Sequence, residues 1–199
     1  MAALQTDTNV SSKSTPHAPP SSPVTVGGGQ YSAALRHFID LRDGTHGGAS
    51  SRDEKERLYT AAVELLDPYA RQALEELNSQ LMLNTGEVLA SGVRRTQDGG
   101  VEAVWTLSWP GQRAAQVEPV RIRAYFGSGF LHPHLQSGTV GDWPLNVFDD
   151  EQAAAELSTL RVLAAADIHN LVFQLGGDYR IVPATIGERT CERTDDDNR

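Results

Sequence analysis

Two histidines separated by one proline, His132 and His134, lie in the stretch GSGFLHPHLQSGTVGDWPLNVF, residues 127–148. In an extended segment, residues i and i+2 project to the same side, so both imidazoles can be offered to one metal ion. The candidates for a third ligand are Asp142, Asp167 and His169. Because a His-x-His pair specifies a ligand set only loosely, the alternative is a structural loop in which both histidines hydrogen-bond to neighbouring backbone.

The other polar candidates in this half of the chain have structural alternatives as well. Asp167 and His169 fall beside the leucine face of an expected helix, where they form hydrogen bonds from helix to sheet or, alternatively, a catalytic pair. Trp143 is followed by Pro144, and we expect this bulky pair to close the end of the loop over a sheet.

Nucleophilic catalysis has little support in the sequence. The single cysteine, Cys191, lies near an Asp-rich end, where no neighbour need lower its pKa. No Gly-x-Ser-x-Gly motif occurs. The GSG of residues 127–129 is typical of a turn, and the VGGGQ of residues 26–30 lacks the Lys-Ser/Thr end of a phosphate-binding loop.

Composition excludes several function classes. The formal net charge is -9 and the 17 Lys and Arg residues are spread along the chain, so nucleic acid and anionic membranes are excluded as expected partners. One cysteine permits neither an intrachain disulfide nor a cysteine-rich zinc site, which fits a reducing compartment. No signal-peptide pattern or bilayer-length apolar run occurs. We therefore expect a cytoplasmic protein.

The chain divides into three parts by composition. Residues 1–29 are rich in Ser, Thr, Pro and Gly, which predicts a disordered leader. Residues 187–199 are polar and charged, which predicts a tail. Residues 30–186 are expected to form one domain.

The first half of that domain has helical periodicity. Leu35, Phe38 and Leu41 recur at helical spacing. Ser51, with Glu54 three residues later, resembles a capping box that begins a second helix. Since the residue before a proline avoids the helical region, Pro68 is expected to begin a third helix.

The pattern then changes to alternation. GEVLASGVRR, VEAVWTLSWP and PVRIRAYF read as three strands of an antiparallel meander, with a turn at TQDGG. Asp149 with Gln152 begins a long leucine-rich helix, and DYRIVPA suggests a last short strand. The expected fold is α+β: a β-meander with N-terminal helices and a long C-terminal helix packed on the sheet.

The order of these pieces resembles the ubiquitin-conjugating fold over roughly residues 70–173. ALEELNSQL is similar to that family's N-terminal helix, WTLSWP and EPVRIRAYF to two of its strands, and HPHLQSG to its His-Pro-Asn loop, with His134 in place of the asparagine. GDWPLNVF and a helix follow in the same order. The resemblance implies a sheet crossed by that helix.

The resemblance also implies a loss of activity. The family's catalytic cysteine would fall near Gly141 or Asp142, where this chain has none, so no thioester forms there. The helices expected between residues 31 and 66 have no counterpart in the family. A similar fold that lacks the nucleophile does not imply the same activity. Members of the fold that lack the cysteine bind protein partners, and the resemblance implies such a role here.

Three hypotheses follow. The first is a non-catalytic interaction module that needs no cofactor and docks a protein partner on a loop containing His132, His134, Asp142 and Trp143. The second is a small enzyme that uses a divalent metal such as zinc or iron, held by His132, His134 and His169 or Asp142. The third is a scaffold or assembly factor whose helices between Tyr31 and Leu83 carry the partner surface.

Overall fold

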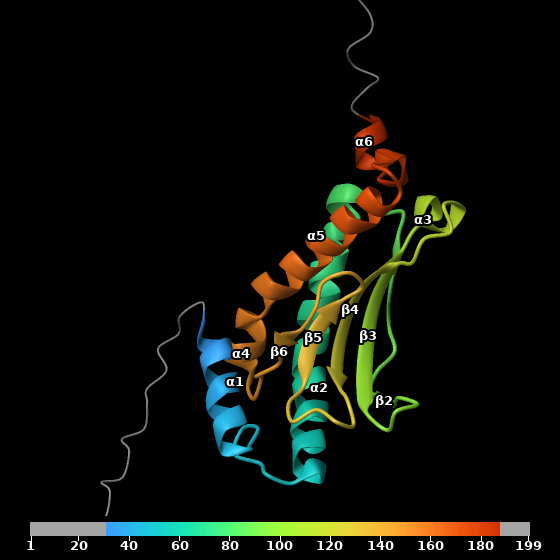
Figure 1. Ribbon diagram of the computed structural model, residues 1–199. Helices are drawn as coiled ribbons and strands as arrows, with labels where there is room; N and C mark the ends of the chain where they lie inside the picture. Colours follow the sequence, from blue (N-terminus) through green and yellow to red (C-terminus); the bar gives the residue numbers. More distant parts are fainter. Residues whose placement is uncertain (1–30, 188–199) are drawn as a thin grey trace, which may run out of the picture.

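The computed structural model describes residues 31–187, which form an antiparallel sheet with helices on one face (Figure 1). The strands are β1 (Glu87–Ala90), β2 (Arg94–Arg95), β3 (Val101–Ser108), β4 (Val120–Phe126), β5 (His134–Ser137) and β6 (Trp143–Pro144). Their order is β1-β3-β4-β5-β6, with β2 also paired to β3. The expected α+β class with an antiparallel sheet is confirmed.

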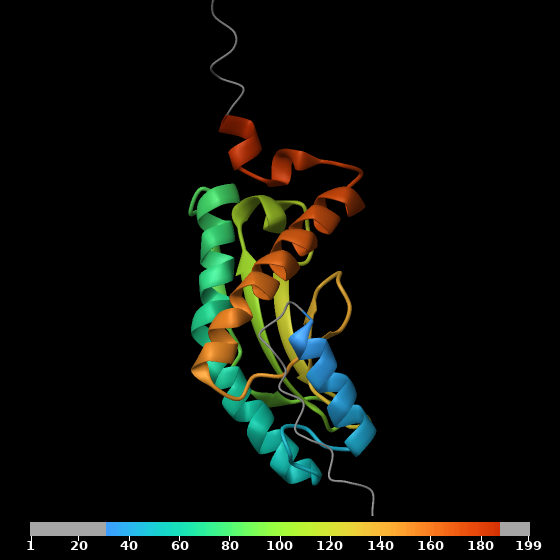
Figure 2. The ribbon, with the colours of Figure 1, turned by 90° about the vertical axis from the view of Figure 1, so that its left-hand side faces the viewer.

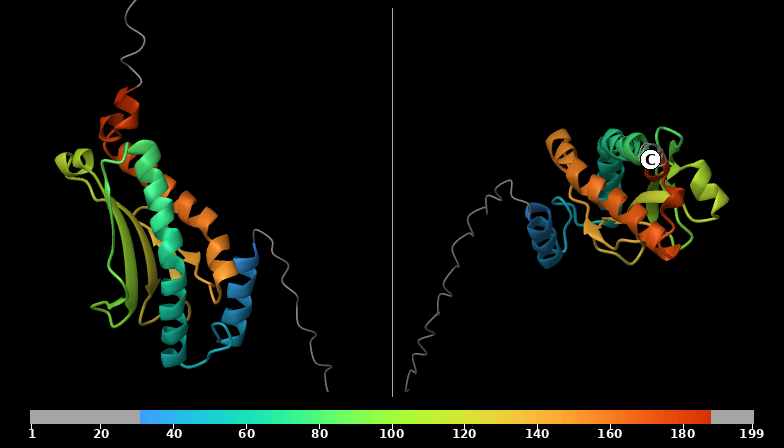
Figure 3. Two further views of the ribbon diagram at one scale, coloured as in Figure 1. Left: turned by 180° about the vertical axis from the view of Figure 1, so that it is seen from behind. Right: turned by 90° about the horizontal axis from the view of Figure 1, so that it is seen from above.

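Alternation in β3 and β4 sets the two faces of the sheet. Every second residue of each strand is buried, and Trp105 pairs with Ile122 in the antiparallel register. The buried face packs against α2 (Arg52–Leu81) and α5 (Leu157–Gln174), which cross it side by side (Figure 2). The opposite face carries no described helix (Figure 3). The sheet therefore has one apolar and one polar side, as the alternation predicts.

Helix α2 corrects one prediction. The capping box is present, since Ser51 Oγ accepts from the Glu54 amide, but the helix continues through Pro68 instead of ending before it. Pro68 removes one backbone hydrogen bond, at a cost of about 3 kcal/mol. Leu66 and Ala70, on either side of it, are fully buried against the sheet, and burial of this continuous apolar stripe offsets the loss.

The C-terminal part differs from the prediction in two places. Asp149 caps its helix as expected, but the helix divides at Glu156 into α4 (Asp150–Ala155) and α5. The predicted strand at residues 178–184 is wrong: a 3₁₀ turn, η1 (Tyr179–Ile181), and a short helix, α6 (Ala184–Gly187), take its place. Ile181 and the next residue are both buried. The segment therefore covers one end of the core with two consecutive side chains, without the alternating burial of a strand.

The remaining elements lie at the ends of the sheet. A short helix, α3 (Pro110–Ala114), follows β3. Helix α1 (Ser32–Asp43) packs beside β6, away from the main helix pair. Among residues 31–187, no helix has the length and apolarity that crossing a membrane requires. The predicted leader and tail lie outside the described residues.

Candidate metal centre

Four histidines meet where α1 adjoins the sheet. His37 comes from α1, His46 from the α1–α2 loop, His132 from the loop before β5, and His134 from the first position of β5. The ring centroid of His132 lies 4.8 Å from that of His37 and 5.7 Å from that of His46. The centroids of His37 and His134 are 5.3 Å apart. Segments about 90 residues apart in the sequence thus contribute imidazoles to one cluster.

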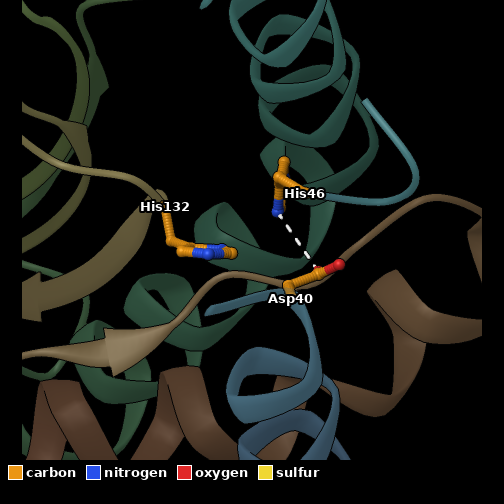
Figure 4. A group of neighbouring side chains, drawn as sticks. All are labelled: Asp40, His46 and His132. Carbon is orange, nitrogen blue, oxygen red and sulfur yellow. Dashed lines mark ion pairs between the residues drawn. The ribbon is translucent and has the colours of Figure 1, made fainter. Parts of the chain in front are cut away.

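Asp40 completes a compact group of potential ligands within this cluster. One ligand atom from each of Asp40, His46 and His132 lies within 4.8 Å of the others. The His46 Nδ1 is 4.0 Å from an Asp40 carboxylate oxygen. Figure 4 shows the three side chains approaching one another from α1, the α1–α2 loop and the loop before β5. Two imidazoles and one carboxylate are a donor set for zinc or non-haem iron.

The two histidines of this group are buried with unused ring nitrogens. His46 is 0% exposed and His132 is 1% exposed. Within the described part of the chain, none of their four ring nitrogens has a hydrogen-bond partner. A buried polar group without a partner costs about 1–3 kcal/mol, so such groups are rare in folded proteins. A cation between the rings and the carboxylate would satisfy one nitrogen of each.

The local sequence of the α1–α2 loop fixes His46 and Asp40. Gly44 ends α1 in the left-handed conformation with φ 68°. Thr45 Oγ1 then donates to an Asp40 oxygen over 2.8 Å, and the Gly47 amide donates to the other over 3.3 Å. Gly47 has φ 55°, and a Cβ there would collide with the ring of Phe148. Glycine at position 47 therefore lets the loop lie close to the core and aims His46 inward.

Lys55, on α2, connects the two loops that carry the histidines. This lysine is 5% exposed. Its Nζ donates to the carbonyl of Gly44 over 3.0 Å and to that of Leu131 over 3.3 Å. Gly44 lies two residues before His46, and Leu131 lies directly before His132. One ammonium group therefore holds both histidine loops on the same side of α2.

Burial keeps the histidines in the form that binds metals. Desolvation lowers the pKa of His46 to about 4 and that of His132 to about 4, and nearby positive charge at Lys55 acts in the same direction. Desolvation also lowers the pKa of His37 and of His134. All four rings are consequently neutral at pH 7. Metal ions bind neutral imidazole, so no proton has to be displaced there.

Of the residues predicted as ligands, only His132 belongs to the compact group. His134 lies next to His37 but outside that group. Asp142 is exposed, and one of its oxygens accepts a hydrogen bond from the Gln136 side chain. His169 is exposed on α5, with Nδ1 3.3 Å from the Asn170 side-chain oxygen. The fold thus brings His132 and His134 into one cluster of histidines and leaves Asp142 and His169 exposed.

Two other predicted residues have structural positions. Asp167 is buried and accepts from the Arg121 amide over 2.9 Å and from Thr139 Oγ1 over 2.7 Å. This confirms the predicted helix-to-sheet hydrogen bond. Trp143 is half-buried and pairs with Leu135 in the β5–β6 ladder, so it forms part of the sheet edge. Cys191 lies outside the described residues.

The sequence interpretation missed three members of the cluster. His37 and Asp40 are three residues apart, a spacing that puts two side chains on one face of a helix. His46 stands beside two glycines in THGG. The spacing of His37 and Asp40 was a usable signal. Nothing local, however, connects these residues to His132, because α2 and four strands separate them along the chain.

Comparison with known proteins gives no relative for this chain: no family model, no curated protein and no solved structure matches it.

Proposed function

We propose that this protein binds a divalent transition metal ion, zinc above all, through Asp40, His46 and His132. The observation that carries the proposal is the pair of fully buried imidazoles whose four ring nitrogens have no hydrogen-bond partner among the described residues. Histidine nitrogens and carboxylate oxygens are ordinary zinc ligands at about 2.0–2.2 Å. The carboxylate supplies the negative charge that a buried cation requires.

Binding needs only a small contraction of the site. Ligand atoms around one zinc ion lie about 3–3.5 Å apart, as follows from those bond lengths in a tetrahedron. The three candidate atoms already lie within 4.8 Å of one another. Movement on the order of an ångström, shared by α1 and two loops, therefore closes the site around the ion.

The role of the ion in this proposal is to join segments that apolar packing does not join. The candidate ligands come from α1, from the α1–α2 loop and from the loop before β5. The side of α1 that carries Asp40 also carries His37, whereas Leu35, Phe38 and Leu41 of the same helix are exposed. A metal ion would add attachment energy between α1 and the loop before β5.

Metal titration of purified protein tests the proposal. The full chain is prepared without a histidine tag, stripped with a chelator and titrated with zinc by calorimetry. The expected result is one tight site in the wild type and in the His169→Ala control, and at least about tenfold weaker binding in His46→Ala and in His132→Ala. Equal affinity in all four proteins would exclude the assigned ligands.

A second candidate function is protein binding by a module shaped like the ubiquitin-conjugating fold, without catalysis. It is supported by the succession of helix, meander, loop and helix, and by an unusual helix α1. Apolar residues spaced as i, i+4, i+7 and i+10 are exposed along α1 and at its N-cap: Tyr31, Leu35, Phe38 and Leu41. Such spacing suits a helix that lies in a hydrophobic groove of another protein. Phe130 and Leu131, on the loop before β5, are also exposed.

The partner we propose is therefore a protein with an apolar groove that receives α1. A photo-crosslinking residue at position 38 in the source cell identifies it, and the purified pair is then measured directly. Binding should fall at least about tenfold in Phe38→Ala, as for a helix anchor, and remain in Val162→Ala, an equally exposed control on α5. Concentration-dependent dimerisation of the isolated chain that Phe38→Ala abolishes would contradict a foreign partner.

A further inference from the structure

His37 lies beside the proposed metal ligands on the same side of α1 as Asp40. It precedes Asp40 by three residues, so the two side chains leave one face of the helix one turn apart. Paired donors at i and i+3 of a helix are a recurring way to present two ligands to one metal centre. Among the described residues, His37 Nδ1 is buried and has no hydrogen-bond partner. This imidazole therefore lies beside the compact group of Asp40, His46 and His132, outside it as His134 is, with a ring nitrogen available to bind a metal ion.

The spacing of His132 from His37 and from His46 is close to that of imidazoles on a single ion. Two imidazoles bound to one tetrahedral zinc, at Zn–N distances of about 2.0–2.1 Å, have ring centroids about 5 Å apart. The centroid of His132 lies 4.8 Å from that of His37 and 5.7 Å from that of His46. Each of these two distances, taken separately, is close to that of two imidazoles on one ion.

We propose that His37 is the fourth ligand, so that the ion is held in a closed tetrahedral shell of three histidines and Asp40. This inference rests on the proposed function and adds the coordination number and the selectivity. Four protein ligands leave no open position for water, which is the arrangement of zinc sites that hold a structure together. The shell favours zinc and cobalt(II) over ions that require octahedral oxygen ligands.

His134 is the rival for the fourth position. Its ring centroid is 5.3 Å from that of His37, and it is the second histidine of the His-x-His pair. Its surroundings differ, however: His37 shares one helix with Asp40 and its ring centroid lies 4.8 Å from that of His132, whereas the ring of His134 also packs against Phe130, with centroids 5.6 Å apart.

The closed shell has a consequence for α1. Two of the four ligands, His37 and Asp40, belong to this helix. The ion then ties α1 to the sheet through its inward face and leaves the apolar residues of the helix on the outside. Removal of the ion then releases α1 from the sheet and exposes the inward face of the helix. Exposure of this face therefore depends on the concentration of available metal.

Cobalt(II) substitution tests the fourth ligand, since four-coordinate cobalt(II) absorbs visible light far more strongly than five- or six-coordinate cobalt(II). The full chain, metal-free and without a tag, is titrated with cobalt(II) as wild type, His37→Ala, His134→Ala and His169→Ala. We expect intense bands in the wild type, His134→Ala and His169→Ala. His37→Ala should bind cobalt(II) more than about tenfold more weakly, with weak bands.

Free imidazole provides the decisive control. If His37 acts as a ligand, added imidazole fills its place in His37→Ala and restores the intense bands, which a merely structural role would not allow. Intense bands in His37→Ala without imidazole, or their loss in His134→Ala instead, would overturn the inference. Weak bands in a wild type that does bind cobalt(II) would also overturn it and leave the proposed function standing. No cobalt(II) or zinc binding by the wild type would refute the proposed function itself.

Discussion

Helices α2 and α1 contact the rest of the molecule through different kinds of side chain. Where α2 and α5 cross the sheet, the helices turn apolar residues inward; Leu66 and Leu74 of α2 are completely buried. At the other end, α1 turns His37 and Asp40 inward, while Phe38 remains 62% exposed. Burial of apolar surface therefore explains the position of α2 and does not explain the position of α1.

This difference shows what an amphipathic pattern can and cannot say. In α2 the apolar stripe marks the core side, as periodicity predicts. In α1 the apolar stripe marks the outside, because the inward face carries polar side chains that converge with loop histidines. Periodicity identifies a helix and its two faces. Which face is covered depends on what the rest of the fold brings to it.

The largest expected effect is at the helix–sheet core. Leu66→Ala should lower the free energy of unfolding by about 2–5 kcal/mol, because it leaves a cavity where the side chain is 0% exposed. Chemical denaturation of the metal-free protein measures it. A loss below about 1 kcal/mol would mean that α2 is not packed on the sheet as described.

The next effect should come from the metal at the α1 end. Zinc at about 100 times its dissociation constant should raise the free energy of unfolding of the wild type by about 2.7 kcal/mol. Leu66→Ala should gain the same amount, since its cavity is remote from the ligands, and His46→Ala should gain much less. Thermal unfolding with and without zinc measures these increments. An equal increment in His46→Ala would place the ion elsewhere.

A pH dependence should distinguish the two ends further. Burial lowers the pKa of His46 to about 4 in the folded protein, whereas an unfolded histidine has a pKa of about 6.5. As pH falls below 6.5, the unfolded chain takes up this proton first, so stability falls with pH between 6.5 and 4. From pH 6.5 to 5.5 the loss is about 1 kcal/mol for one such histidine.

His46→Gln provides the control for that measurement. In metal-free protein, denaturation at the two pH values should show a loss smaller by about 1 kcal/mol in His46→Gln than in the wild type. Only the change in the free energy of unfolding between the two pH values is compared. A cavity left by the substitution lowers stability equally at both pH values and therefore cancels. An unchanged slope would mean that His46 titrates in the folded state as it does in water.

The smallest effect should be that of the same leucine substitution on α1. Leu35 is 44% exposed, and Leu35→Ala should change the stability of the isolated chain by less than about 0.5 kcal/mol. Alanine is also the better helix former, which offsets part of any lost contact. A loss comparable to that of Leu66→Ala, measured by the same denaturation, would show that the two helices are held alike.

Much of the sheet could be predicted from sequence, because alternation is a local signal. The buried face of β3 and β4 follows directly from it, and the Ser51-x-x-Glu54 motif, also local, predicts the capping box. The continuation of α2 through Pro68 could not be predicted, since it depends on apolar residues of the sheet that the local proline rule ignores. The same holds for residues 178–184, whose buried pair caps the core end-on.

The candidate site could be predicted from sequence only in part, for a related reason. His132 was predicted as a ligand because another histidine lies two residues away. Its closest partners in the fold come instead from α1 and from the loop after it, and only tertiary packing brings them together. The His-x-His pair contributes two of the four clustered histidines, His132 and His134, and the other two, His37 and His46, come from segments that no local pattern connects to it.

The most direct test of the metal centre is elemental analysis of the full chain, purified without a histidine tag from cells supplied with zinc. We expect about one zinc ion per chain in the wild type, as for a single structural site, and also in His169→Ala. The His46→Ala, His132→Ala double variant should contain almost none. Zinc far below stoichiometric level in the wild type, or an undiminished content in the double variant, would contradict the proposed centre.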